Sequence, residues 1–232
     1  MTIFTRQTRF LALLALFFLL AANLSLWAKL LEIYPVEMAF NSQLLHFSSI
    51  AVFFALTTVL FMLWVCHGKS GKWIAALLLL VSSLAGYYMD HYGVVIDVVM
   101  INNIFETDAK EITGLLNSSM LMRLVALGIL PAVLTIRYWP ASEGAKRELA
   151  SRLKLSLGLL LAVTLTIVVA PANFADFVKE HKITRLYANP TGWTYSMISY
   201  LSQSARAATR KTVLHEAAAD TQEVGTGDPG GG

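Results

Sequence analysis

Five long apolar runs, separated by short polar turns, occupy most of the chain before residue 172. Each run is close to the roughly 20 residues that a helix needs to cross a hydrocarbon core about 30 Å thick. A helix satisfies its backbone groups within its own segment, which is required in lipid because lipid offers no hydrogen bonds. The pattern therefore predicts five transmembrane helices, at about residues 10–28, 47–66, 73–89, 121–139 and 153–170.

The first apolar run has an alternative interpretation as a signal peptide, because Arg6 and Arg9 precede it. Its length of about 19 residues exceeds the roughly 7–15 residues of a signal-peptide core. Trp27, Lys29 and Glu32 follow the run, where a signal peptide has a cleavage site of small residues. These features favour a retained first transmembrane helix.

The overall composition agrees with this pattern. Of the 232 residues, 56% are hydrophobic and 14% are charged, and the mean hydropathy is +0.60. Soluble domains contain about 25% charged residues. The sequence therefore predicts an all-α, multi-pass integral membrane protein. Its net charge of +3 belongs to loops that face lipid headgroups, and no nucleic-acid partner is expected because no basic stripe lies on a soluble face.

The distribution of Lys and Arg between alternate loops predicts the orientation in the membrane. Basic residues that flank membrane spans concentrate on the cytoplasmic side. We therefore expect a cytoplasmic N-terminus and, after five spans, a C-terminus on the periplasmic side of a bacterial inner membrane. Nine basic residues lie in the N-terminal segment and in the second and fourth loops, and three lie in the other loops: the nine are Arg6, Arg9, Lys69, Lys72, Arg137, Lys146, Arg147, Arg152 and Lys154, and the three are Lys29, Lys110 and Arg123.

Hydroxyl and small residues within the spans have two interpretations, a polar conduit or helix packing. Packing is favoured, because small residues let helix backbones approach one another and hydroxyls bond to nearby carbonyls. The predicted spans have no central charged residue or histidine, which argues against an ion pump or a proton-coupled transporter. The residues concerned are Ser25, Thr57, Thr58, Ser82, Ser83, Gly86, Thr164 and Thr166.

The polar residues outside the membrane concentrate in the 90–120 loop, which the predicted orientation makes periplasmic. Asn103, Thr107 and Glu111 are spaced four residues apart, so on a continuous helix they would share one face. That face would present an amide, a hydroxyl and a carboxylate, which suit the ammonium group of an ethanolamine headgroup. Tyr92 and Asp97 are further candidates in the same loop.

Local helix capping is the competing explanation for these residues. Asp108 precedes Glu111 by three residues, which is the spacing of a capping box, and Thr107 is an alternative cap. In that arrangement Asn103 belongs to a preceding element. Asp90, His91 and Tyr92 are similarly explained as ordinary residues of a membrane boundary.

No metal site is expected within this chain. The five histidines do not have metal-ligand spacing, and the single Cys66 leaves no cysteine pair. The sequence also lacks a glycine-rich phosphate loop and a nucleophile elbow.

The chain changes character after the fifth span. Residues 173–188 are mixed and charged, and residues 189–192 read as a turn or helix start. An amphipathic helix at 193–214 is expected to lie at the membrane surface as an interfacial or bridging helix. The composition of residues 215–232 is that of a flexible linker. We therefore expect this chain to be the membrane half of a longer protein.

The segment YGVVIDVVMINNIFETDAKE, residues 92–111, resembles the segment after the third transmembrane helix of bacterial lipid A phosphoethanolamine transferases. This family includes the mobile colistin-resistance enzymes. The five-span layout, the Asn189-Pro190 element and the C-terminal linker composition are similar as well. The matching positions within the segment are Tyr92, Gly93, Asp97, Met100, Asn103, Thr107 and Glu111.

The resemblance implies a function that the residues alone do not specify. Members of the family join five transmembrane helices to a periplasmic, zinc-dependent domain. They transfer phosphoethanolamine from phosphatidylethanolamine to a threonine nucleophile and then to lipid A, which weakens the attraction of the outer membrane for polymyxins. By this resemblance, Asn103, Thr107 and Glu111 engage the donor headgroup, and Tyr92 and Asp97 have a supporting role.

The motif around the family's nucleophile and its zinc ligands have no counterpart in this chain. The resemblance therefore implies that zinc and catalysis belong to a C-terminal domain of the same protein, and that this chain alone is inactive. Two alternatives remain open. One is a non-enzymatic membrane scaffold whose periplasmic loops bind a partner protein. The other is a small lipid transporter subunit, which the lack of intramembrane charge disfavours.

Overall fold

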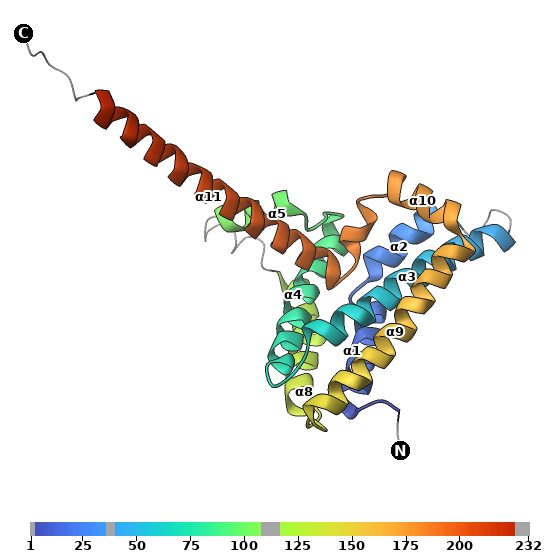
Figure 1. Cartoon of the computed structure of the whole chain (residues 1–232). Helices are drawn as coiled ribbons and strands as arrows, with labels where there is room; N and C mark the ends of the chain where they lie inside the picture. The colour runs from blue at the N-terminus through green and yellow to red at the C-terminus, as the bar shows by residue number, and fades with distance from the viewer. Residues whose placement is uncertain (1–2, 36–39, 108–116, 226–232) are drawn as a thin grey trace, which may run out of the picture.

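The computed structural model describes residues 3–35, 40–107 and 117–225, and every regular element in these ranges is a helix (Figure 1). This confirms the predicted all-α class. The elements in chain order are α1 (Arg6–Ala21), α2 (Leu24–Ile33), α3 (Phe40–Val65), α4 (Gly71–Tyr92), α5 (Val98–Glu106), α7 (Ser118–Arg123), the π-helix η1 (Leu124–Ile129), α8 (Leu130–Arg137), α9 (Ala145–Val169), α10 (Pro171–Glu180), the 3-10 helix η2 (Thr184–Tyr187) and α11 (Thr191–Gly225).

Four stretches of helix are long and apolar enough to cross a membrane, and a bent pair makes a fifth candidate. The four are Leu44–Val65, Gly71–Tyr92, Ser118–Arg137 and Ala145–Val169. The bent pair is α1 with α2, whose axes meet at 61°. Leu157 and Leu161 on α9 are 72% and 71% exposed, as expected for a surface whose solvent is lipid. The multi-pass membrane class is therefore confirmed.

The prediction of one continuous helix over residues 10–28 is wrong, because the chain breaks at Ala22 and Asn23. The side-chain amide of Asn23 donates to the carbonyl of Phe18 at 2.7 Å and to the carbonyl of Asn189 at 2.8 Å. The first bond occupies a carbonyl at the end of α1, and the second ties the break to a distant segment. Side-chain bonds of this kind compete with the helical backbone ladder.

Hydroxyls in the spans serve packing, as predicted. Thr57, Thr58, Thr164 and Thr166 each donate to the carbonyl four residues earlier in their own helix. Ser83 on α4 instead bonds across to the carbonyl of Arg123 at 3.1 Å, where the π-helical segment begins. These bonds satisfy the hydroxyl groups locally, so they supply no polar path through the bundle.

The N-terminal end of the bundle is closed by a buried polar network, which we call the N-terminal clasp: Thr5, Gln7, Thr8, Glu148, Ser151 and Arg152. The hydroxyl of Thr5 donates to Glu148 Oε2 at 2.8 Å. Arg152 donates from Nη1 to the carbonyl of Leu63 at 2.9 Å, in the last turn of α3, and from Nη2 to Gln7 at 3.3 Å. Arg152 was expected in a loop, but α9 begins at Ala145, eight residues before the predicted start of the span.

At the opposite end, α11 is rooted in the break between α1 and α2. The backbone N–H of Asn189 donates to Asn23 Oδ1 at 2.6 Å, and the side-chain amide of Asn189 donates to the carbonyl of Ala22 at 2.9 Å. Trp193 donates from its indole N–H to Ser82 at 2.9 Å. A side chain at Gly192 would collide with the carbonyl of Leu186, so only glycine fits this close approach.

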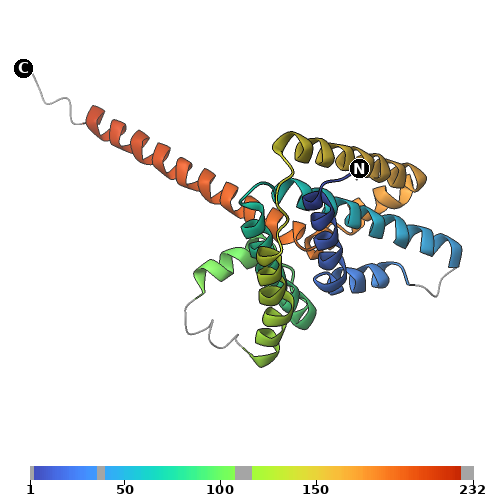
Figure 2. The same cartoon turned by 90° about the horizontal axis from the view of Figure 1, so that it is seen from below.

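From this root α11 runs outward past the other described helices (Figures 1 and 2). Met197 and Tyr200 pack against the bundle, as the predicted amphipathic pattern requires, whereas Tyr195, Ile198 and Leu201 are exposed. The prediction of a flexible linker is wrong for residues 215–225, because α11 continues to Gly225. Residues 226–232 lie outside the described residues.

Candidate functional site

The candidate site lies where α4 ends and α5 begins. Gly93 has φ +64°, and its backbone N–H bonds to the carbonyl of Met89, which ends α4 in a left-handed cap. The chain then leads to Asp97, whose side chain caps α5 by accepting from the N–H of Met100 at 2.8 Å. This hydrogen bond gives Asp97 a structural role, and its expected role in substrate binding remains a prediction.

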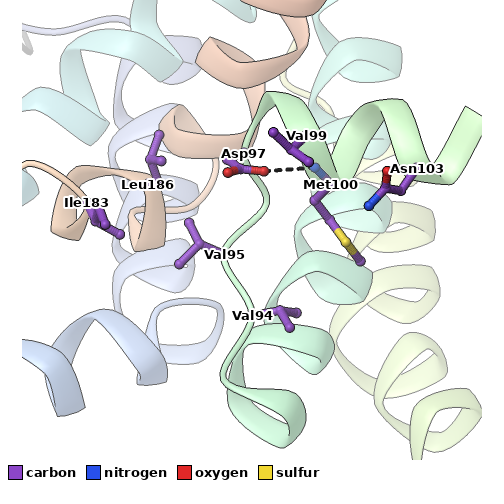
Figure 3. A pocket seen from close by; sticks show the side chains of 8 residues that line it. All are labelled: Val94, Val95, Asp97, Val99, Met100, Asn103, Ile183 and Leu186. Carbon is purple, nitrogen blue, oxygen red and sulfur yellow. Dashed lines mark hydrogen bonds between the residues drawn. The ribbon is translucent and has the colours of Figure 1, made fainter.

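Beside this segment is a cavity of about 420 Å³, which lies between residues 94–103 and the η2 region (Figure 3). Its volume is within the usual range of small-molecule sites, about 300–1,000 Å³. Six of the lining side chains are apolar and two are polar. The lining residues are Val94, Val95, Asp97, Val99, Met100, Asn103, Ile183 and Leu186.

Two of the three principal candidates lie together at this site. Asn103 is exposed on α5 and lines the cavity. The hydroxyl of Thr107 donates to the backbone carbonyl of Asn103 at 2.6 Å. However, α5 ends at Glu106 and Thr107 has an extended backbone, so the premise of a continuous helical face through Thr107 is wrong. Glu111 and Asp108 lie outside the described residues.

Tyr92 is at the end of α4 and does not line the cavity. Its ring is stacked on Tyr88, with centroids 5.6 Å apart, and the residue is 54% exposed. Tyr87 in turn stacks on His91 at 4.3 Å and donates its hydroxyl to Asn117. An aromatic group at this level is typical of a membrane–water boundary.

An ion pair that the sequence did not predict holds the same end of α4. Arg123 Nη1 lies 2.5 Å from Asp90 Oδ2, and the two side chains are 14% and 17% exposed. Ser25 on α2 donates its hydroxyl to the same carboxylate, so three helices meet here. Gly86 provides the room, because a Cβ there would lie 3.0 Å from Arg123 Nη2.

A sequence signal for this pair did exist. Arg123 follows directly on the start of an apolar run, and a charged residue inside a span needs a partner. Arg123 lies near the start of the predicted span at 121–139, although the orientation argument counted it with the loops, and the helical span begins at Ser118. The identity of the partner could not be inferred, because Asp90 belongs to a different helix.

Metal ligands do not gather in the described ranges. Within residues 3–35, 40–107 and 117–225, no group of three or more His, Cys, Asp or Glu side chains is placed to hold an ion. The fold and the site together define a multi-pass helical membrane protein with an apolar cavity at one end of the bundle.

The family described as phosphoethanolamine transferase EptA/EptB matches residues 52–205. The match covers more than half of the chain, and the chain belongs to this family. Phosphatidylethanolamine transferase Mcr-1 of Escherichia coli is 29% identical over 210 residues, which are 88% of this chain and 38% of Mcr-1. Mcr-2 of the same species is 31% identical over 204 residues, 86% of this chain and 36% of Mcr-2.

Among solved structures, the chain is similar to the integral membrane lipooligosaccharide phosphoethanolamine transferase A of Neisseria meningitidis. The TM-score is 0.80 at 20% identity, and the match covers 85% of this chain and 37% of that one. This likeness confirms the fold. The chain thus spans less than two fifths of the length of the relatives it matches, and it represents the membrane domain of the family.

Proposed function

We propose that this chain is the membrane domain of an enzyme that transfers phosphoethanolamine from phosphatidylethanolamine to lipid A, and thereby protects against polymyxins such as colistin. Its role is to anchor a catalytic domain and to bind the headgroup of the donor lipid. The observation that carries the proposal is the position of Asn103, an exposed amide at the edge of an apolar cavity in a membrane protein of the transferase family.

The chemistry of the site suits a primary ammonium group. An ammonium has three N–H donors and needs acceptors. Asn103 offers its side-chain oxygen, and the hydroxyl of Thr107, which already donates to the Asn103 carbonyl, keeps lone pairs to accept with. Glu111 would add a carboxylate, and Tyr92 an aromatic surface at headgroup level.

The catalytic step belongs, in this proposal, to a C-terminal domain that carries zinc and a threonine nucleophile. This chain would then be inactive alone. Its contribution is to hold the donor lipid in a defined orientation, which removes a large entropic part of the barrier. The distribution of Lys and Arg supports a cytoplasmic N-terminus, with α5 and α11 on the periplasmic side.

Mass spectrometry of lipid A from expressing cells tests this function. One strain produces the chain alone, and another produces a chimera in which the chain replaces the corresponding part of Mcr-2. We expect a phosphoethanolamine-sized addition only with the chimera. If both proteins reach the membrane and lipid A carries no addition in either strain, the result would favour the scaffold alternative.

Substitutions in the same chimera test the headgroup residues. Asn103→Ala, Thr107→Ala and Glu111→Ala should each lower the modified fraction of lipid A and the protection against polymyxin. Asn102→Ala is the matched control, because Asn102 is the neighbouring amide on α5 and does not line the cavity. Full protection from all three variants at normal expression would exclude a headgroup site at these residues.

A further inference from the structure

We infer that the cavity between residues 94–103 and η2 is a diacylglycerol subsite, which holds the glycerol and the adjoining acyl chains of a membrane phospholipid. The inference deepens the proposed function, because it gives the donor lipid a second point of attachment beside the headgroup position at Asn103. The binding that we assign to the apolar lining residues does not depend on which headgroup the lipid carries.

The lining of the cavity is mostly apolar with polar groups at one edge, which suits an amphiphilic ligand. Val94, Val95 and Met100 form one wall, and Ile183 and Leu186 form the wall that faces them (Figure 3). The carboxylate of Asp97 already accepts the cap bond of α5. Asn103 is therefore the polar lining side chain that has no such helix-capping role, and an occupant would meet a largely apolar surface with one amide at its edge.

The cavity is also open to the surface of the described helices. Val99 and Ile183, one from each wall, are 66% and 63% exposed. The cavity lies directly after the end of α4, a helix long and apolar enough to span the membrane. The end of a spanning helix lies near the headgroups, and the glycerol backbone of a phospholipid lies at the same depth. A lipid could thus enter sideways from the leaflet.

Aromatic residues around the cavity support this depth. Phe105 on α5 is stacked on Tyr200 of α11, with ring centroids 5.3 Å apart and planes 13° apart. Tyr92 is exposed at the end of α4. Aromatic side chains are enriched at the interface between hydrocarbon and water. Met100 inside the cavity is unbranched and flexible, which suits an occupant of variable shape such as an acyl chain.

The subsite makes a specific statement about the proposed reaction. Transfer of phosphoethanolamine forms a bond between phosphorus and the oxygen of the threonine nucleophile and breaks the bond between phosphorus and the glycerol oxygen. The proton of the threonine hydroxyl is balanced by the proton that the glycerol oxygen takes up. Diacylglycerol is the product left behind. A site that recognises the diacylglycerol part should bind donor and product alike, so the product should compete with the donor.

The experiment measures lipid retention by the purified chain. Native mass spectrometry in detergent records binding of dioleoylglycerol, and of dioleoyl phosphatidylethanolamine in competition with it. We expect the wild-type chain to retain dioleoylglycerol, and Ile183→Trp to bind it about tenfold more weakly, because the indole occupies the cavity. Val178→Trp is the matched control, since Val178 is also 63% exposed but lies on α10 outside the cavity.

A second variant and a second lipid keep the outcomes distinct. Leu186→Trp, on the same wall, should reproduce the loss, and thermal unfolding shows whether either variant remains folded. Asn103→Ala should retain dioleoylglycerol and lose only a preference for phosphatidylethanolamine over phosphatidylcholine. No binding of dioleoylglycerol by the wild type, or equal binding by the folded Trp variants and the control, would overturn the subsite. A missing headgroup preference in the wild type would instead count against the proposed function.

Discussion

At the N-terminal end of the bundle the polar side chains are buried and bonded to one another. The opposite end combines a buried network at Asn23 and Asn189 with more exposed polar side chains around α5, two of which line a cavity. In the N-terminal clasp, Glu148 and Arg152 are 7% and 5% exposed. At the other end, Arg123 is half-buried, and Asp90 and Asn103 are exposed residues, although the side chain of Asp90 is turned inward onto Arg123. The same types of residue therefore serve two purposes in one molecule.

The two ends differ in burial because they join different parts of the chain. The N-terminal clasp joins the start of the chain to α9 and to the end of α3, with hydrogen bonds in place of water. At the α5 end, the ion pair between Asp90 and Arg123 and the bond from Ser25 to the same carboxylate join three helices. Burial thus identifies the N-terminal clasp as a stabilising contact, and the proposed headgroup site lies at the end where Asn103 is exposed.

The largest predicted effect is at the N-terminal clasp. Arg152→Ala removes the donors that satisfy the carbonyl of Leu63 and the side-chain oxygen of Gln7, and removes a positive charge that interacts with the buried Glu148. We expect a loss of about 3 kcal/mol in the free energy of unfolding, because buried groups without partners are costly. Chemical unfolding in detergent measures the change. Lys154→Ala, an exposed cation on the same helix, should change it little; equal losses would mean that the clasp does not stabilise the fold.

A smaller effect is predicted for the ion pair at the α5 end. Asp90→Asn should lower the free energy of unfolding by about 1–2 kcal/mol, between the values of surface and buried pairs, because both side chains keep some solvent contact. A double-mutant cycle with Arg123→Gln isolates the coupling between the two charges. A coupling energy as large as the loss of unfolding free energy in Arg152→Ala would show that the ion pair is as shielded from solvent as the N-terminal clasp.

Near neutral pH, the smallest effect on stability is predicted for the ionisation of Cys66, which tests the closure of the N-terminal end directly. Burial raises the pKa of the Cys66 thiol to about 12, and the charge of Arg152 opposes the rise only in part. The folded state favours the neutral thiol, so this contribution to stability is complete below about pH 8.5 and is lost as the pH rises toward 12.

The measurement for Cys66 is the rate of maleimide labelling at pH 8. The thiol of the folded chain should be labelled slowly, and the labelling rate should rise only after the chain unfolds. A Cys66→Ala, Tyr92→Cys variant moves the thiol to an exposed position at the α5 end and should label rapidly. Fast labelling of Cys66 in the folded chain would contradict the closed N-terminal end.

The sequence was sufficient for the membrane class, the number of apolar segments and the location of the candidate site. The length of an apolar run is a local quantity that the thickness of the bilayer sets, so the apolar segments could be located without a structure. The similarity of residues 92–111 to a family segment directed attention to Asn103 and Thr107. Both predictions used information that lies within a few turns of one helix or one loop.

Only the tertiary structure decided the features that join distant segments. Asn23 breaks the first span because its amide bonds to Asn189, 166 residues later. Arg152 enters a helix because its charge is satisfied by Leu63 and Gln7. The cavity needs Val95 and Met100 on one side and Leu186 on the other. Bonds and contacts between such distant residues leave no periodic pattern along the chain, and therefore appear only when the helices are packed together.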